Sequence, residues 1–289
     1  MTTAITSTAN PRVQALRALH TAKGRAEAGQ FLVEGPHLLD AALEAGVLPV
    51  LTLFAPEVLE RTASGRRLLG RLAEARAGGA ELIEATPAVI ERAADTQTPQ
   101  GIVAAIAAAA VAPAAVRARR RGRARPLVLI LDALSDPGNV GTLLRAALAA
   151  DVDEVWLAPG SADPLGPKVV RAGSGAHFHL PVHPGQTWDE IATRLRGAPA
   201  VRQVLLAEAS AAQPYDALDL TQRSALIVGN EAHGPSRAAA KLATVRVSIP
   251  MWNGVESLNA AIAASVICFE AGRQRRAQQQ SHPEPAPTE

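Results

Sequence analysis

Residues 127–145, LVLILDALSDPGNVGTLLR, indicate the fold most clearly. This stretch opens with five apolar residues that do not alternate with polar ones, which indicates a strand covered on both faces, as in a parallel sheet flanked by helices. Asp136 can cap a helix that begins at Pro137, and the leucines beyond supply a packing face. Ligands of α/β proteins bind where such a strand ends and the next helix begins. We therefore expect a site after this strand.

The same arrangement of strand, loop and helix recurs twice downstream. A strand is predicted at 225–228 before the glycine-bounded loop 229–236, and another at 245–249 before a loop and a long helix from about Ser257 to Arg275. Ser257 is the expected N-cap of that helix. The side chains expected to pack along it are Leu258, Ile262, Ser265, Val266 and Phe269. Three such loops in one domain predict a single convergent pocket.

Each of these loops carries polar side chains that folding alone does not explain. Asn139 and Arg145 follow the first strand, and Glu231 follows the second. Asn259 falls in the first turn of an otherwise apolar helix, where a buried amide needs partners. Taken singly, Arg145 is typical of a helix surface, Glu231 of a helix cap, and His233 of a solvated loop.

Residues 1–110 form a second, smaller α/β module in the pattern of apolar segments and turns. Helical stretches within 11–45 are separated by a turn-rich segment at 22–30. The remaining elements of this module are expected as strands at 31–35, 50–54, 81–84 and 101–107 and helices at 37–45, 65–77 and 87–94. In the other module, a helix ending near 150 and a strand at 154–157 are also expected. The Ala-, Pro- and Arg-rich stretch 108–125 is the best domain boundary.

Positive charge is concentrated in that boundary. The formal net charge is +2, and residues 1–112 carry 10 basic and 11 acidic side chains, while residues 126–276 carry 13 and 14. The six arginines of the linker 111–125 have no acid among them, and they are Arg117, Arg119, Arg120, Arg121, Arg123 and Arg125. Such a run suits binding to nucleic-acid phosphates, although a solvated linker would have the same composition.

Several protein classes are excluded by composition. Cys268 is the only cysteine, so neither an internal disulfide nor a cysteine-cluster metal site is possible. The apolar runs are too short to cross a bilayer, and no basic, apolar leader begins the chain. We expect a cytoplasmic protein without metal or membrane partner, with a disordered polar tail at 277–289.

Over about 126–275 the chain resembles the SpoU/TrmH family of SPOUT-class RNA 2′-O-ribose methyltransferases. The resemblance is carried by three motifs, Asn139-Val140-Gly141 with Arg145, Gly229-Asn230-Glu231, and Ile249-Pro250-Met251 with Ser257-Leu258-Asn259, and by Lys168, Arg171 and Ser174-Gly175-Ala176 between them. Residues 1–110 resemble the ribosomal-protein-like RNA-binding domain that often precedes this one, most recognisably at Phe31-Leu32-Val33-Glu34-Gly35.

This resemblance implies a trefoil-knotted α/β methyltransferase domain at 126–276, after an RNA-binding domain at 1–110 and an Arg-rich linker at 111–125. It implies a homodimer formed through the C-terminal domain and RNA as the substrate, with rRNA favoured over tRNA. S-adenosylmethionine would be held by Gly229, Asn230, Ile249, Met251 and Leu258. The reaction centre would be formed by Asn139, Arg145, Glu231, Ser257 and Asn259.

Two positions depart from the family pattern. The glycine of the third motif falls at Gly254, one place later than usual, with Asn253 in its common position, and Pro235 replaces a leucine after the second motif. Three alternatives remain at this point: a base methyltransferase, an inactive RNA-binding protein of the same fold, and a nucleotide-binding oxidoreductase. The last lacks the expected G-x-G-x-x-G after an early strand.

Overall fold

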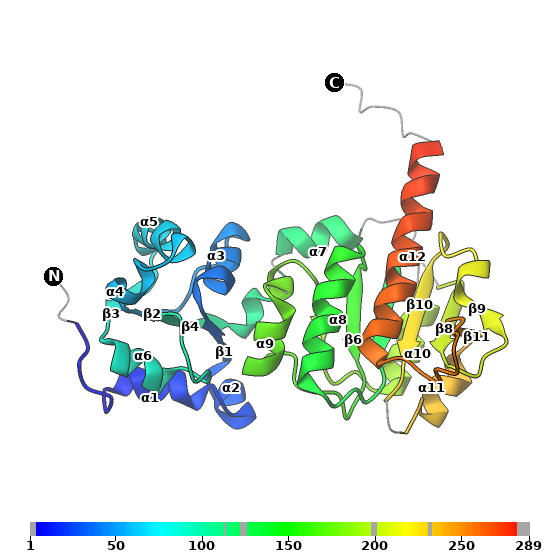
Figure 1. The fold of residues 1–289 in the computed structure, drawn as a ribbon, viewed down its shortest axis with the longest axis horizontal. Helices are drawn as coiled ribbons and strands as arrows, with labels where there is room; N and C mark the ends of the chain where they lie inside the picture. Colours follow the sequence, from blue (N-terminus) through cyan, green and yellow to red (C-terminus); the bar gives the residue numbers. More distant parts are fainter. Residues whose placement is uncertain (1–3, 113, 122–125, 198–200, 231–232, 282–289) are drawn as a thin grey trace. The chain divides into compact units, whose positions relative to one another are not determined.

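The structure is a computed structural model that describes residues 4–112, 114–121, 126–197, 201–230 and 233–281. By their internal contacts the residues divide into two units. The first comprises Met1–Ala114 and Asp163–His179, and the second comprises Ala115–Ala162 and Leu180–Glu289. Figure 1 shows the elements of both, coloured along the sequence.

The first unit is a mixed four-stranded sheet between two layers of helices. Its strands have the order β1-β4-β2-β3, with β4 antiparallel to both neighbours and β2 parallel to β3. The strands are β1 (Gln30–Glu34), β2 (Leu51–Phe54), β3 (Glu81–Glu84) and β4 (Ile102–Ala107). The helices are α1 (Pro11–Ala18), α2 (Ala22–Ala28), α3 (Pro36–Glu44), α4 (Pro56–Leu59), α5 (Ala63–Ala77), α6 (Pro87–Ala93) and α9 (Pro167–Gly173), with short 3-10 turns η1 (Ala108–Ala110) and η2 (Ala176–Phe178).

Alternation along these strands creates two separate cores. The side chains on one face of the sheet, including Phe31 and Ile106, pack against α3 and α5. Those on the other face, including Leu32 and Val103, pack against α1 and α6. Every strand predicted in this unit is present, as are the helices corresponding to α3, α5 and α6, with ends that agree to within two residues. The reason is that the spacing of apolar residues identifies each helix or strand, and prolines and glycines mark where it begins or ends.

The turn-rich reading of residues 22–30 is wrong, because these residues form α2. Thr21 caps the helix by accepting a hydrogen bond from the backbone N–H of Gly24, at 3.1 Å. Gly24 itself is required by packing, since a Cβ there would lie 2.0 Å from the carbonyl oxygen of Ala18. Gly29, with φ of 61°, ends the helix in the left-handed conformation. The two glycines that suggested a turn therefore serve a close contact and a C-cap.

Residues 163–179 belong to the first unit although the chain on both sides of them belongs to the second. Asp163 accepts a hydrogen bond from Nε of Arg25, at 3.1 Å, and the Arg25 side chain is only 8% exposed. Arg171 donates to Asp95 at 2.8 Å and lies 3.6 Å from the carboxylate of Glu34. This segment is therefore attached to the rest of the N-terminal unit by three ion pairs.

The end of the same segment is buried beside β1. The rings of Phe31 and Phe178 lie 6.4 Å apart, and His177 is fully buried next to them with Nε2 2.8 Å from the carbonyl oxygen of Pro164. Burial lowers the pKa of His177, so this ring is neutral at physiological pH. The segment thus contributes apolar surface to the first unit as well as charge.

We expect Asp163→Asn to destabilise the protein by about 2 to 3 kcal/mol, because it leaves the buried Arg25 guanidinium without its counter-ion. The estimate is at the low end for a buried pair, since the Asp163 side chain is 42% exposed. Glu81→Gln is the matched control, because its pair with Arg12 is about half-exposed on both sides and should contribute less than about 1 kcal/mol. Urea unfolding of the full chain measures both, and equal losses in the two variants would contradict this assignment.

The second unit is a parallel sheet with helices on both faces, as the apolar strands predicted. Its seven strands have the order β7-β6-β5-β10-β8-β11-β9, and every pair of neighbours is parallel. The strands are β5 (Leu127–Leu131), β6 (Glu154–Leu157), β7 (Val182–His183), β8 (Gln203–Ala207), β9 (Gln213–Pro214), β10 (Ser224–Val228) and β11 (Val245–Ser248). The helices are α7 (Ala114–Arg121), α8 (Pro137–Ala149), α10 (Trp188–Arg196), α11 (Arg237–Leu242) and α12 (Ala260–Ser281), with η3 at Tyr215–Ala217.

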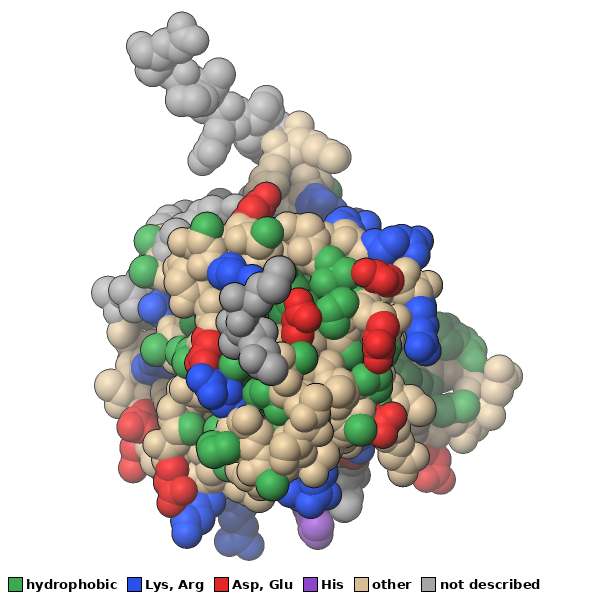
Figure 2. Space-filling model, turned by 90° about the vertical axis from the view of Figure 1, so that its left-hand side faces the viewer, with side chains coloured by type: hydrophobic (Ala, Val, Ile, Leu, Met, Phe, Trp, Pro, Cys, Tyr) green, Lys and Arg blue, Asp and Glu red, His purple; other side chains and the backbone are tan. Residues whose placement is uncertain are grey.

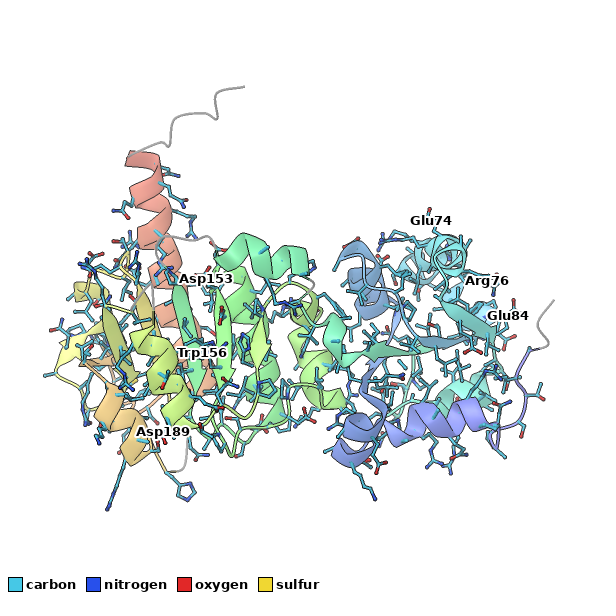
Figure 3. All side chains as sticks on the ribbon, turned by 180° about the vertical axis from the view of Figure 1, so that it is seen from behind. Glu74, Arg76, Glu84, Asp153, Trp156 and Asp189 are labelled. Atoms are coloured by element: carbon cyan, nitrogen blue, oxygen red, sulfur yellow. The ribbon has the colours of Figure 1, made fainter. Side chains whose placement is uncertain are left out.

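Different helices cover the two faces of this sheet. α10 and α11 pack against a cluster that includes Trp156, Ile191 and Leu206, and Figure 3 labels Trp156 on this side. The guanidinium of Arg194 lies 4.8 Å from the centre of the Trp156 ring, a cation–π contact at the edge of the cluster. α8 and α12 lie side by side over the opposite face (Figure 1). The trefoil knot stays a prediction.

Three features differ from the sequence expectations. α12 begins at Ala260 and not at Ser257, and it continues to Ser281, beyond Ala277 where a disordered tail was expected to start. Residues 277–280, AQQQ, are good helix formers, which explains the extension. Residues 282–289 lie outside the described part. The linker contains the helix α7, which carries Arg117 and the arginines at 119–121.

The surface of the first unit is mixed in charge. Figure 2 shows basic and acidic side chains interspersed over its outer face, in keeping with the nearly equal counts in residues 1–112. Among the described residues, no helix has the length and apolarity needed to span a membrane. The same residues contain no group of three or more His, Cys, Asp or Glu side chains placed to hold a metal ion.

Candidate functional site

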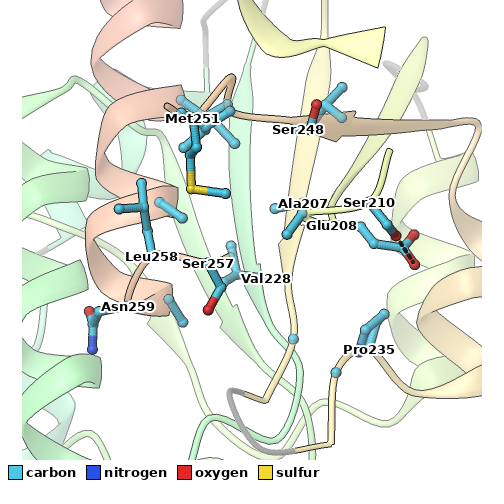
Figure 4. A pocket seen from close by; sticks show the side chains of 18 of the residues that line it. Ala207, Glu208, Ser210, Val228, Pro235, Ser248, Met251, Ser257, Leu258 and Asn259 are labelled. Atoms are coloured by element: carbon cyan, nitrogen blue, oxygen red, sulfur yellow. Dashed lines mark hydrogen bonds between the residues drawn. The ribbon is translucent and has the colours of Figure 1, made fainter. Parts of the chain in front are cut away.

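A cavity of about 560 Å³ opens at the carboxyl ends of three neighbouring strands, β10, β8 and β11. The volume is within the usual range for small-molecule sites. Its lining comes from the residues that end these strands, from the loop before α12 and from the first turns of α12. All five residues expected to hold a cofactor line it, namely Gly229, Asn230, Ile249, Met251 and Leu258. Figure 4 shows Met251 and Leu258 on the same side of the cavity.

The loop after β10 is held by hydrogen bonds to the loop after β5. The Asn230 amide donates to the carbonyl oxygen of Ala133 at 2.9 Å, and the backbone N–H of Ser236 donates to the Asp132 carboxylate at 2.6 Å. The backbone of Gly229 also passes very close to the returning chain, since a Cβ there would lie 2.7 Å from the nitrogen of Pro235. This position therefore admits only glycine without a shift of the loop.

The third motif reaches the cavity along an extended backbone. Ile249 and Met251 line the cavity, while the intervening Pro250 and the following Trp252 are exposed. Ser257, Leu258 and Asn259 line it too, in a segment without regular structure that leads into α12. This wall of the cavity is therefore formed by the alternate residues Ile249 and Met251 and by the three residues just before α12.

Asn259, and not Ser257, caps α12. Its side-chain oxygen accepts hydrogen bonds from the backbone N–H groups of Ala261 and Ile262, at 2.9 and 3.2 Å. The Ser257 N-cap is therefore wrong, and so is the expectation that Asn259 is buried, because it is exposed. An amide oxygen reaches the first N–H groups at the Ncap position, and this satisfies the helix end.

The same amide joins the first and third motifs. Nδ2 of Asn259 donates to Oδ1 of Asn139 at 3.2 Å, so two residues that are 120 positions apart in sequence meet beside the cavity. Asn139 is held in turn at the start of α8, where its backbone N–H donates to the Asp136 side chain at 2.8 Å, the cap predicted from the sequence. Two of the five residues expected at the reaction centre are thus in direct contact.

Arg145 is placed differently from the residues described so far. Arg145 is exposed on α8 and is not among the residues that line the cavity. It follows Thr142 by one turn on that helix. Glu231 lies outside the described residues. His233 is exposed, with Nδ1 3.2 Å from the Asn230 side-chain oxygen.

Sequence reasoning missed one wall of the cavity. The strand β8 and the residues after it, Glu208, Ala209 and Ser210, line the cavity opposite Leu258 (Figure 4). Glu208 pairs with Arg246 on the neighbouring strand β11, with the two charged groups 2.7 Å apart. The apolar run Val204-Leu205-Leu206-Ala207 that ends at Glu208 is the signal that could have revealed this wall.

The face of α12 that packs inside this chain is also different from the predicted one. The buried residues are Ala260, Ala261, Ala264, Ile267, Cys268 and Ala271. Ile262 and Phe269, which were expected to pack, are 53% and 45% exposed. They border a second, apolar hollow together with Thr142, Ala261, Ser265 and Val266. Burial raises the pKa of Cys268 to about 12, which keeps this thiol protonated and unreactive.

Two family models match this chain. One described as the SpoU rRNA methylase family matches residues 126–269, and one described as the MRM3-like substrate binding domain matches residues 10–104. The first match contains the whole parallel sheet and the lining of the cavity up to Ile267. The second contains the strands β1 to β3 and the first half of β4.

Relatives and solved structures resemble the chain along nearly its whole length. It is 34% identical over 272 residues to an uncharacterized tRNA/rRNA methyltransferase of Synechocystis sp., covering 94% of each protein. It is 31% identical to the 23S rRNA (guanosine(2553)-2′-O)-methyltransferase RlmP of Bacillus subtilis, over 92% of this chain and 97% of that protein. The crystal structure of the SpoU methyltransferase AviRb from Streptomyces viridochromogenes with the cofactor AdoMet matches 93% of this chain and 100% of that chain, with a TM-score of 0.76 and 31% identity.

Proposed function

This chain belongs to the SpoU rRNA methylase family of RNA methyltransferases, and we propose that it transfers the methyl group of S-adenosylmethionine to a ribose 2′-hydroxyl of RNA. One observation carries the proposal. The five residues that the motifs assign to the cofactor come from two strand ends and the segment before α12, and all of them line one cavity.

The residues around this cavity suit S-adenosylmethionine. Val228, Met251 and Leu258 offer apolar surface for an adenine ring, and the backbone around Gly229 and Ile249 offers hydrogen-bonding groups. A Cβ at Gly229 would collide with the backbone of Pro235, so the narrow bend that forms this wall depends on glycine. The solved AviRb structure, which holds AdoMet and matches nearly all of this chain, supports the same assignment.

When bound, S-adenosylmethionine supplies an electrophilic methyl group, and the protein has to orient the ribose oxygen and handle its proton. The contact between Asn139 and Asn259 places two amides beside the cavity, where they can orient a hydroxyl. Guanidinium groups stay protonated in proteins, so Arg145 is assigned to an RNA phosphate and to negative charge developing on the oxygen, and water accepts the proton. By the family resemblance, Ser257 and Glu231 also belong to the proposed reaction centre.

RNA is the proposed substrate, with rRNA favoured over tRNA. The N-terminal unit supplies a substrate-binding domain, and the arginine run at 117–125 would add phosphate contacts that position RNA without selecting the nucleotide. RlmP, the Bacillus subtilis relative, is named for 2′-O-methylation of 23S rRNA. A cytoplasmic location stays a prediction.

Methyl transfer from radiolabelled S-adenosylmethionine to unmodified rRNA and tRNA transcripts tests this function. Digestion of the product to nucleosides then identifies the methylated atom. The proposal expects label in a 2′-O-methylnucleoside from rRNA. Label in a methylated base would establish the base methyltransferase instead, and an absence of label with calorimetrically normal cofactor binding would favour the inactive RNA-binding protein.

The same proposal includes a homodimer formed through α8 and α12. Ile262, Val266 and Phe269 recur at helical spacing on one face of α12, and Thr142 of α8 borders them. Surface of this kind is costly to expose and is typical of an interface between proteins. A second copy of this chain is the proposed occupant, because the family resemblance predicts a dimer through this domain. Arg145, one turn beyond Thr142, then lies at the edge of the interface.

Ile262→Glu is expected to convert the dimer to monomer, because it places a charge within an apolar interface without a partner. Sedimentation velocity at micromolar concentration measures the change. Leu48→Glu is a matched control, because Leu48 is a similarly exposed aliphatic residue, 42% accessible, in the first unit. A dimer that persists in the Ile262 variant, or a wild-type chain that is monomeric, would exclude this interface.

A further inference from the structure

Trp252 stands out among the three tryptophans of the chain. Trp156 is buried in the core of the second unit and Trp188 packs against the same cluster, whereas the Trp252 side chain is 74% exposed. A large aromatic ring left in water is unusual, since tryptophan is highly buried on average. Trp252 directly follows Met251, which lines the proposed cofactor cavity, so it is next to the site of the proposed reaction.

A tight turn presents this ring. The backbone N–H of Val255 donates to the carbonyl oxygen of Trp252 at 3.3 Å, and the two central residues, Asn253 and Gly254, have φ angles of 58° and 73°. Positive φ at both central positions defines a type I′ turn, for which Asn-Gly is the most favourable pair. The displaced glycine of the third motif thus has a structural role, because Asn253-Gly254 together reverse the chain next to Trp252.

The backbone before the turn separates the cavity from the solvent side. Ile249 and Met251 line the cavity, and the alternate residues Pro250 and Trp252 face outward. Trp252 therefore directly follows a residue of the cavity wall and is itself open to solvent, where an RNA base can reach it. Val255, the last residue of the turn, is 52% exposed but has no aromatic face on which a base could stack.

The charges of this loop favour one kind of partner. Between Ile249 and Asn259 the only charged side chain is Glu256, so the loop offers no attraction to phosphate. What it offers is an aromatic face, and bases of unpaired RNA stack on such faces. A nucleotide that is drawn out of its stack into a cavity leaves its base without stacking partners.

We propose that Trp252 is a stacking surface for an unpaired base of the RNA substrate at the methylated nucleotide or next to it. This inference rests on the proposed function and adds a residue that positions the substrate. The stacking replaces base–base contacts that the RNA gives up, while the cofactor is held by other residues. Trp252 should therefore affect RNA and leave cofactor binding alone.

The test compares Trp252→Ala, Trp252→Phe and the control Val255→Ala in the full chain, with an unmodified rRNA transcript as substrate. We expect Trp252→Ala to lower kcat/KM for RNA roughly tenfold to a hundredfold, from the measured strength of base–aromatic stacking. Phenylalanine should restore most of it, and Val255→Ala should resemble wild type. The dissociation constant for S-adenosylmethionine, the melting temperature and the salt dependence of RNA binding should not change, since no charge is removed.

Equal kcat/KM for wild type and Trp252→Ala would overturn the proposal, and so would a loss that phenylalanine does not restore. A shift of Trp252→Ala from dimer to monomer in sedimentation would assign the ring to a contact between protein chains instead. Quenching of tryptophan fluorescence by single-stranded oligoadenylate gives a readout independent of methyl transfer. Quenching in wild type and its loss in Trp252→Phe support stacking even if ribose methylation fails, so the two proposals can fail separately.

Discussion

Replacing Arg145 with alanine is expected to slow methyl transfer roughly a hundredfold to a thousandfold, the usual effect of removing one preorganised donor from a developing negative charge. The dissociation constant for S-adenosylmethionine should stay close to that of wild type, because Arg145 is not among the residues that line the cavity. Single-turnover methylation at saturating cofactor measures the first effect, and calorimetric titration measures the second. Full activity in the alanine variant would remove Arg145 from the mechanism and weaken the ribose-methylation proposal.

Arg145→Lys separates two ways in which the guanidinium can act. If it contributes only positive charge near the reacting oxygen, lysine should recover part of the lost rate. If it binds a phosphate through two parallel hydrogen bonds, lysine should recover little, because an ammonium group is a point charge without the planar fork. The recovered fraction, measured under the same single-turnover conditions, distinguishes these roles.

The exposed position of Arg145 leaves open which pocket it serves in the proposed dimer. Mixing an Arg145→Ala chain with a chain whose cavity is blocked gives dimers in which one pocket is intact and only the other chain has the arginine. Activity regained on mixing means that Arg145 acts at the partner's pocket. No regained activity, with dimer exchange confirmed by sedimentation, means that it acts at the pocket of its own chain.

Gly229→Ala is expected to weaken S-adenosylmethionine binding about thirtyfold, which corresponds to about 2 kcal/mol, a typical cost of overpacking. The added Cβ would lie 2.7 and 2.8 Å from the nitrogen and Cα of Pro235 and 2.9 Å from the carbonyl carbon of Gly234. These are backbone atoms, so the strain can be relieved only by moving the loop that closes this side of the cavity. This variant also supplies the impaired cavity for the mixing experiment, which is run at a cofactor concentration that fills the wild-type cavity but not the Gly229→Ala cavity.

Gly70→Ala is the matched control for this substitution. Gly70 is exposed within α5, and a Cβ there meets nothing within 4 Å. Alanine should leave cofactor affinity unchanged and raise the free energy of unfolding by about 0.5 to 1 kcal/mol, through helix propensity. Wild-type affinity in the Gly229 variant, measured by calorimetry beside this control, would show that the close approach to Pro235 does not shape the cavity.

The local pattern of apolar, capping and turn residues was sufficient to predict most helices and strands of both units. The five apolar residues Leu127–Leu131 are a strand buried on both faces, and Asp136 caps α8 as predicted. These features depend on neighbours a few residues away, through side-chain period, proline position and capping hydrogen bonds. The second and third motifs also predicted residues that share a pocket, because parallel strands carry their following loops to one edge of the sheet. Asn139 and Arg145 of the first motif, by contrast, are not among the residues that line it.

Local pattern failed where distant residues decide the outcome. Residues 22–30 have the composition of a turn, yet they form α2 because Gly24 fits against Ala18 and Arg25 is paired with Asp163. The apolar residues of α12 were recognised, but not which of its faces would be buried within this chain. Hydrophobic periodicity identifies an apolar face without identifying what covers it.

Residue patterns alone were enough to identify the two α/β modules, the order of the motifs and the residue types at the site. Tertiary packing places β8 between β10 and β11, so that Glu208 joins the cavity, and it packs residues 163–179 with the N-terminal unit. It also decided that Asn139 and Asn259 meet while Trp252 faces solvent. The physical reason is that strand order and long-range contacts depend on the burial and pairing of residues far apart in the chain, which local periodicity does not encode.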